Sequence, residues 1–248
     1  MSATSGKNLT VGILQCGEVL EIFQPQFGDY NSMIEDKLTA ADPALRCRSW
    51  RVLDGEIPDP DACDAWITTG SRESVNDDNA WTTGFCDFVA RVAQTDIPFI
   101  GICYGMQMIA HALGGKVALA EKGWGVGVAI SRVYRQMPWM REPNESINLL
   151  VSHQEQVAAL PKGAELIAGS DFCPNSIFAI GDHMLGIQGH PEFTTAYSLA
   201  LMELRRDIIP ATRIEQGMDS LSLSVDGARA FDWIVSFIRS GTLASRAA

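Results

Sequence analysis

The chain has 248 residues, a net charge of −11, 46% hydrophobic residues and 20% charged residues. This composition is typical of a soluble globular protein, and the negative charge argues against nucleic acid or an anionic membrane as the main partner. No apolar run approaches the length of a membrane span, and the polar first ten residues predict neither a signal peptide nor an anchor. The six cysteines show no C-x-x-C pair and no metal-ligand spacing, which favours a reducing cytoplasm and predicts no metal site.

Short apolar segments alternate with amphipathic segments over the first 115 residues. The apolar segments predict strands, the second of them at a sheet edge, and the segments with apolar residues at i, i+3 and i+4 predict helices. Uninterrupted apolar strands that alternate with helices indicate a parallel sheet covered by helices. The predicted strands span residues 11–15, 47–53, 65–68 and 99–102, and the predicted helices span residues 27–41, 85–92 and 106–113.

The turn Gly-Ile-Cys-Tyr-Gly at residues 101–105 lies between a predicted strand and a predicted helix. It has the G-x-nucleophile-x-G pattern of a strand-to-helix elbow, in which two glycines permit a tight turn and the central side chain projects outward. At the N-terminus of the following helix, free N–H groups and partial positive charge favour a thiolate. We therefore interpret Cys103 as a nucleophile rather than as a buried structural cysteine.

The chain after residue 115 is richer in glycine and in short strands, which indicates a hairpin-rich portion. The glycines at 123, 125 and 127 lack the lysine of a P-loop and the spacing of a dinucleotide fingerprint, so we interpret them as a tight turn. No repeat or linker is evident, and residues 1–248 are predicted to form one domain with a core of about 11–240 and flexible ends. Strands are predicted within 116–135 and at 149–151, 166–168, 176–180 and 185–188, helices at 197–208 and 231–238, a loop or short helix at 213–224, and a frayed tail at 241–248.

A cysteine nucleophile needs a base, and the base needs a group that orients it. Of the four histidines, His111 lies on the helix behind the elbow and His183 lies in a polar turn, so we interpret them as structural and solvated. His190 is followed two residues later by Glu192, whose carboxylate can fold back and hold the imidazole tautomer. As the candidate base, His190 with Glu192 therefore ranks first and His153 ranks second.

Three motifs together resemble class I glutamine amidotransferase domains of the type attached to GMP synthetase. They are G-I-C-Y-G-M-Q at 101–107, S-H-Q-E-Q-V at 152–157 and G-I-Q-G-H-P-E at 186–192. The resemblance covers roughly residues 11–195, and the combination is far more specific than any one motif. It implies the flavodoxin-like glutaminase fold, which is a three-layer sandwich with a mostly parallel central sheet flanked by helices and a small antiparallel portion.

The resemblance also implies roles for single residues. Cys103 would attack the side-chain amide of glutamine, His190 would act as general base and acid, and Glu192 would orient the imidazole. The reaction would pass through a γ-glutamyl thioester and needs neither a metal nor an organic cofactor. The remaining implied positions are Gly70 and Tyr104 in the oxyanion hole, and Gln107, Ser152, Gln154 and Glu155 in the glutamine pocket.

Three positions depart from the family pattern, and all three adjoin the expected substrate. The usual Gly-Gly-Pro is Thr69-Gly70-Ser71, which predicts a differently shaped oxyanion strand. The usual aspartate of the S-H-x-D motif is Glu155, which is one methylene longer. The usual bulky residue before the histidine is Gly189, which is expected to open space beside His190.

By this resemblance the chain is a glutaminase that releases glutamate from glutamine and supplies ammonia to an acceptor enzyme. Because no synthetase module is evident, we expect that enzyme to be a separate subunit. The alternative is a free-standing γ-glutamyl peptidase that uses the same triad, with Gly189 giving room for the rest of the peptide. A catalytically silent binding protein is disfavoured by the complete triad. The expected ligand is a small molecule, without a nucleic-acid or membrane partner.

Overall fold

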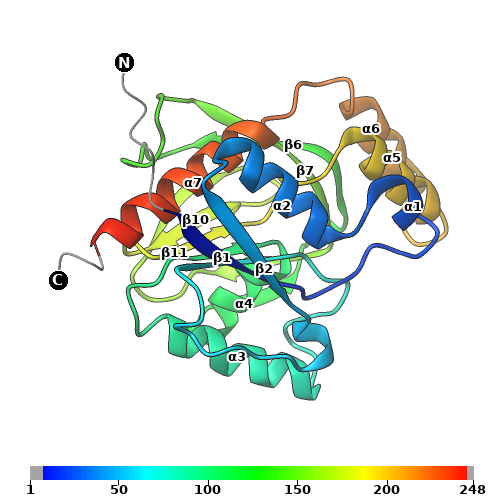
Figure 1. The fold of residues 1–248 in the computed structure, drawn as a ribbon. Helices are drawn as coiled ribbons and strands as arrows, with labels where there is room; N and C mark the ends of the chain where they lie inside the picture. The colour runs from blue at the N-terminus through cyan, green and yellow to red at the C-terminus, as the bar shows by residue number, and fades with distance from the viewer. Residues whose placement is uncertain (1–7, 245–248) are drawn as a thin grey trace.

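The computed structural model of the chain describes residues 8–244 and contains helices on both faces of a large sheet (Figure 1). The strands are β1 (Leu9–Leu14), β2 (Leu45–Trp50), β3 (Ala65–Thr68), β4 (Phe99–Ile102), β5 (Lys116–Leu119), β6 (Gly125–Val133), β7 (Ser146–His153), β8 (Glu155–Ala159), β9 (Ala164–Gly169), β10 (Ile177–Ile180) and β11 (Met184–Ile187). The helices are α1 (Gln24–Phe27), α2 (Tyr30–Ala41), α3 (Ala80–Val92), α4 (Tyr104–Ala112), α5 (Thr195–Leu204), α6 (Ala211–Ser220) and α7 (Gly227–Ala244), with a 3-10 turn at Val52–Asp54.

Nine strands form the central sheet in the order β2-β1-β3-β4-β11-β10-β9-β6-β7. The first five of these pair in parallel, and the strands from β11 to β7 pair in antiparallel fashion. The predicted α/β architecture and the edge position of β2 are confirmed. Most of the predicted antiparallel portion is a continuation of the same sheet, and within residues 8–244 β5 and β8 form a separate two-stranded antiparallel sheet.

The two faces of the sheet bury two separate apolar cores. Successive side chains of a strand point to opposite faces, so Val11 and Ile13 pack under α2 and α7, whereas Leu14 packs on the side of α3 and α4. Figure 1 shows these two helix pairs on opposite sides of the strands. Burial on both faces explains why the parallel strands are uninterrupted apolar runs.

Side-chain caps begin most of the helices that flank the sheet. Asp29 and Ser32 form a capping box at α2, and Asn79 and Thr194 accept hydrogen bonds from the first turns of α3 and α5. Helix α4 differs, because its N-cap residue is Cys103 and no side chain caps it. The first N–H groups of α4 therefore remain available for a ligand.

Several boundaries differ from the sequence expectations. The polar segment expected as a loop or short helix forms α6, and α7 continues through residue 244 instead of fraying from 241. Strand β8 was not expected, because an alternation of polar and apolar residues over only five positions is too short to indicate a strand. Of the three glycines interpreted as a tight turn, Gly123 lies in a turn with φ of 77°, whereas Gly125 and Gly127 belong to β6. The predicted flexible ends at 1–7 and 245–248 lie outside the described residues.

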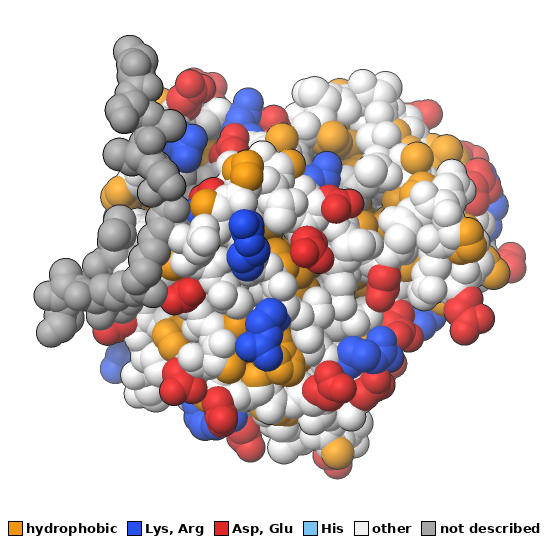
Figure 2. Space-filling view, viewed as in Figure 1, with side chains coloured by type: hydrophobic (Ala, Val, Ile, Leu, Met, Phe, Trp, Pro, Cys, Tyr) orange, Lys and Arg blue, Asp and Glu red, His pale blue; other side chains and the backbone are white. Residues whose placement is uncertain are grey.

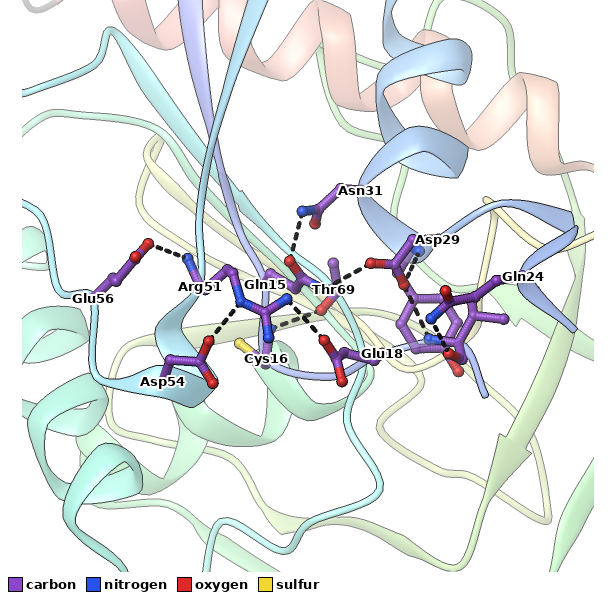
Figure 3. A network of polar contacts seen from close by, with 12 residues as sticks. Gln15, Cys16, Glu18, Gln24, Asp29, Asn31, Arg51, Asp54, Glu56 and Thr69 are labelled. Atoms are coloured by element: carbon purple, nitrogen blue, oxygen red, sulfur yellow. Dashed lines mark hydrogen bonds and ion pairs between the residues drawn. The ribbon is translucent and has the colours of Figure 1, made fainter. Parts of the chain in front are cut away.

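The strand order reverses between β1 and β3, and sheets of this kind bind ligands beyond the carboxyl ends of their strands near such a point. The loop that follows β1 is held there by a polar network (Figure 3). The buried amide of Gln15 donates to Asp29 Oδ2 at 2.8 Å and accepts from Asn31 Nδ2 at 2.8 Å. Asp29 also accepts from the backbone of Val19, which ties the loop to the start of α2.

The surface carries mixed charge. On the face drawn in Figure 2, lysine and arginine side chains lie scattered among acidic ones and form no continuous basic area. An example is Arg51, which pairs with Glu18 at 2.8 Å beside the loop after β1. None of the helices within residues 8–244 combines the length and apolar character that crossing a membrane requires.

Candidate active site

Cys103 lies in a strained turn between β4 and α4. Its φ of 50° and ψ of −100° make it the sole non-glycine residue with positive φ in the described part of the chain. Such backbone strain costs about 1–3 kcal/mol and persists where the surroundings enforce it. A Cβ on Gly101 would overlap the backbone of Gly105, and a Cβ on Gly105 would overlap the Thr68 hydroxyl. Both glycines are therefore required by the close approach of chains, as the elbow pattern predicts.

His190 and Glu192 form a buried pair. Nδ1 of His190 lies 2.8 Å from Oε1 of Glu192, and the ring of Phe193 stacks on the imidazole with centroids 4.0 Å apart. The second oxygen of Glu192 has no hydrogen-bond partner among the described residues. Burial lowers the pKa of His190, but the charges of Glu192 and Cys103 and hydrogen bonds to both outweigh it and raise the pKa to about 10. His190 is thus held as an imidazolium at neutral pH.

His153 lies at the end of β7 in a different electrostatic setting. Its Nδ1 faces the backbone oxygen of Glu155 at 3.0 Å. Burial lowers the pKa of His153 to about 4; the hydrogen bond to that backbone oxygen opposes this shift, and the charge of His190 adds to it. His153 is therefore neutral at pH 7. Of the other histidines, His111 is exposed at the end of α4, and His183 is half-buried with Nε2 3.4 Å from the Ala93 carbonyl.

Gly70, at the carboxyl end of β3, lies against the imidazole. A Cβ at this position would approach His190 Cε1 to 2.7 Å. The Thr69 hydroxyl accepts from the backbone N–H of Cys16 at 2.9 Å and donates to the Gly70 carbonyl at 3.0 Å, as Figure 3 shows in part. The backbone N–H groups of Gly70 and Tyr104 have no acceptor within residues 8–244. Thr69, one of the departures from the family pattern, therefore fixes the loop that carries Gly70.

A cleft of about 360 Å³ opens beside Cys103. It is lined by all four residues expected in the glutamine pocket, namely Gln107, Ser152, Gln154 and Glu155. Three of them have side-chain partners: Gln107 donates to the Glu155 carbonyl at 2.8 Å, Ser152 Oγ accepts from Arg205 Nη1 at 2.6 Å, and Glu155 Oε1 accepts from Asn76 Nδ2 at 3.4 Å. His190 is buried behind the cleft and is not part of its lining.

Three residues at the site were missed by the sequence analysis. Gln188 places its amide nitrogen 3.5 Å from Cys103 Sγ, Phe193 stacks on His190, and Arg205 lines the cleft. Gln188 lies within the G-I-Q-G-H-P-E motif and Phe193 directly follows it, so their position in the sequence was a usable signal. Arg205 follows a helix end and belongs to no motif.

The expectation that Gly189 opens space beside His190 is wrong. A Cβ at residue 189 would lie 2.6 Å from Leu149 Cβ and 3.0 Å from its Cδ1. The volume that a larger residue would occupy is therefore filled by a side chain of β7. Gly189 allows the segment after β11 to pack closely against β7 and does not give additional room for substrate.

Comparison with known proteins identifies the family of the chain. Residues 58–200 match the family described as glutamine amidotransferase class-I. The chain is 33% identical to γ-glutamyl peptidase 3 of Arabidopsis thaliana over 153 residues, which are 58% of this chain and 61% of that protein. It is 30% identical to γ-glutamyl peptidase 4 of the same plant over 181 residues, which are 70% of this chain and 71% of that protein. The alignment with peptidase 3 thus spans less than two thirds of that relative.

Two further similarities bear on family and fold. GMP synthase of Bacillus subtilis is 38% identical over 128 residues, which are 51% of this chain and 24% of that enzyme. The crystal structure of a glutamine amidotransferase from Thermotoga maritima superposes with a TM-score of 0.71 at 18% identity, covering 96% of this chain and 99% of that one. The latter likeness shows a common fold. Because the family match covers more than half of its residues, the chain belongs to the class-I glutamine amidotransferase family.

Proposed function

We propose that the chain hydrolyses γ-glutamyl amide bonds, such as the side-chain amide of glutamine, through a thioester on Cys103. The observation that carries this proposal is the position of Cys103, in a strained elbow at an uncapped helix N-terminus with the His190–Glu192 pair beside it. A strained backbone at a cleft and a buried charged pair are arrangements that proteins place at reacting groups.

In this proposal the Cys103 thiolate attacks the γ-carbonyl carbon, and the N–H groups of Gly70 and Tyr104 donate to the oxyanion. His190 gives its proton to the departing nitrogen, which leaves a γ-glutamyl thioester. The neutral imidazole then takes a proton from water, and the hydroxide equivalent attacks the thioester to release glutamate and the thiolate. Glu192 holds the imidazole and stabilises its charged form.

With glutamine as substrate the released nitrogen is ammonia, and a separate synthetase subunit is its acceptor. The similarity to the glutamine-hydrolysing GMP synthase of Bacillus subtilis supports that assignment. The six unpaired cysteines support a cytoplasmic location.

The second candidate is hydrolysis of γ-glutamyl peptides without an acceptor. It is favoured by the cleft, which continues beyond Cys103 to Trp124, Arg205 and Ile208. The alignment with γ-glutamyl peptidase 4, which covers about seven tenths of both chains, supports it as well.

Glutamate release by the isolated chain separates these candidates. We expect glutamate from at least one of two substrates, glutamine and a γ-glutamyl dipeptide, and none from either when Cys103 is replaced by serine. Efficient turnover of the dipeptide with negligible glutamine hydrolysis, even with candidate synthetase subunits added, selects the peptidase. Hydrolysis of glutamine that rises with such a subunit selects the amidotransferase. No glutamate from either substrate would contradict the proposal.

A further inference from the structure

Arg205 is an ordered cation in the cleft without an anionic partner. It is half-buried just after α5, its Nη1 donates to Ser152 Oγ at 2.6 Å, and its guanidinium lies 5.8 Å from the ring centroid of Trp124. Within residues 8–244 no carboxylate pairs with it, whereas the adjacent Arg206 pairs with Glu203. A positioned guanidinium with free donors is well suited to bind a carboxylate.

The surroundings of Arg205 are fixed before any ligand arrives. Arg213 donates to the backbone carbonyl of Trp124 through Nε at 2.9 Å and Nη2 at 2.6 Å, which anchors the loop that carries the indole. Ile208, which is 67% exposed, lines the cleft next to Arg205. The cation is thus bordered by apolar area that a ligand side chain would cover.

Arg205 directly follows helix α5, whose first turn packs near His190. The ring of Phe193 stacks on His190, and Tyr197 of α5 packs edge-on against Phe193 with centroids 4.8 Å apart. The positive charge of Arg205 opposes the burial that raises the pKa of Tyr197. In the proposed reaction His190 protonates the departing nitrogen, so a leaving group that extends along α5 would reach Arg205.

Another part of the cleft lining suits the glutamyl part of a substrate. Glu155 belongs to this lining: Gln107 from α4 donates to its backbone carbonyl, and its carboxylate faces Asn76 Nδ2 at 3.4 Å. A carboxylate at this place is complementary to the α-ammonium group of a glutamyl residue. The Glu155 carboxylate and the Arg205 guanidinium are therefore complementary to different charged groups of one substrate.

We propose that Arg205, together with Trp124, forms a subsite for the free carboxylate of the amino acid released from a γ-glutamyl peptide. This inference rests on the hydrolysis at Cys103 proposed above and names its substrate class, which is γ-glutamyl peptides whose leaving residue keeps its carboxylate and carries an apolar side chain. The one other carboxylate in such a substrate is that of the glutamyl residue itself, and the experiment separates the two.

The test compares three substrates: γ-glutamylphenylalanine, the same compound with a C-terminal carboxamide, and glutamine. For wild type we expect KM for the acid to lie below that for the carboxamide. Arg205→Met is expected to raise KM for the acid about tenfold or more, the size of a lost charge-assisted hydrogen bond, with little change in kcat. KM for the carboxamide and for glutamine should change less than about twofold. Arg205→Lys should raise KM for the acid less than Arg205→Met does. Arg206→Met, at an exposed site outside the cleft, should leave KM unchanged for all three substrates.

Each other outcome contradicts part of the account. An equal rise in KM for all three substrates in Arg205→Met would assign Arg205 to the glutamyl carboxylate and overturn the leaving-group subsite. No change in KM on any substrate after Arg205→Met, or equal wild-type KM for acid and carboxamide, would overturn the subsite altogether.

If wild type hydrolyses none of the three substrates, the proposed function fails. In that case calorimetric binding of the acid and the carboxamide to Cys103→Ala decides the inference. Tighter binding of the acid than of the carboxamide, lost in the double variant with Arg205→Met, would support it, and equal binding would overturn it.

Discussion

Replacement of His190 by alanine is expected to lower kcat on any γ-glutamyl substrate by at least ~10²-fold, the usual contribution of general acid–base catalysis. His190 is the imidazole that pairs with a buried carboxylate, at 2.8 Å from Glu192, and it lies against Gly70. Without it, no group beside the thioester can protonate the leaving nitrogen or activate water. Steady-state release of glutamate measures the effect.

The matched control is His153→Ala. His153 is equally buried, but it is neutral at pH 7 and bonds to the backbone of Glu155, so its loss should lower kcat less than about tenfold. Alanine at 190 leaves Glu192 buried without a partner, so unfolding in urea should be followed for both variants to detect a loss of stability. The variant His190→Gln serves as a further control, because it keeps a hydrogen-bond donor for Glu192. If His153→Ala lost as much kcat as His190→Ala with substrate binding intact, the base would be His153.

Glu192→Gln is expected to move the alkaline limit of kcat/KM to lower pH. In the wild type the pKa of His190 is about 10, because the charges of Glu192 and Cys103 outweigh burial. Removal of the Glu192 charge lets burial lower this pKa, by about 1–3 units as is usual for loss of an adjacent opposite charge. The imidazolium, which is the acid for the leaving nitrogen, would then be lost as pH rises through the lower value.

The profile should be measured between about pH 6 and pH 10 for both proteins, since this interval spans the ordinary and the raised pKa of histidine. At acidic pH the variant should retain a larger share of wild-type activity than at alkaline pH. The same alkaline limit in both proteins would contradict the electrostatic role assigned to Glu192.

The elements that the sequence predicted best are those whose pattern is local. The elbow at residues 101–105 needed only two glycines, a preceding apolar strand and a following amphipathic helix, and the structure places Cys103 as that pattern predicts. The edge position of β2 could be predicted because polar and apolar residues alternate weakly along this strand. Glu192 could be predicted beside His190 because the two are neighbours in sequence.

The remaining features depend on contacts between distant residues. Thr69 fixes the Gly70 loop through the backbone of Cys16, and nothing in either local sequence indicates that pairing. The occupation of the space at Gly189 by Leu149 follows from the isolated bridge between Leu150 and His190, which brings the segment after β11 against β7. Arg205 reaches Ser152 across the cleft from the end of α5, and such a contact leaves no periodic signal.

Labelling with a glutamine-like diazo-ketone tests the assignment of Cys103 as the nucleophile. The account predicts one equivalent of label, located on Cys103 by peptide mass, and no labelling of Cys103→Ser. The other five cysteines are internal controls, since burial raises the pKa of each, to about 12 for Cys47 and Cys173 and to about 11 for Cys63. Labelling of Cys16, Cys47 or Cys86 to the same extent as Cys103, or an unlabelled Cys103, would contradict it.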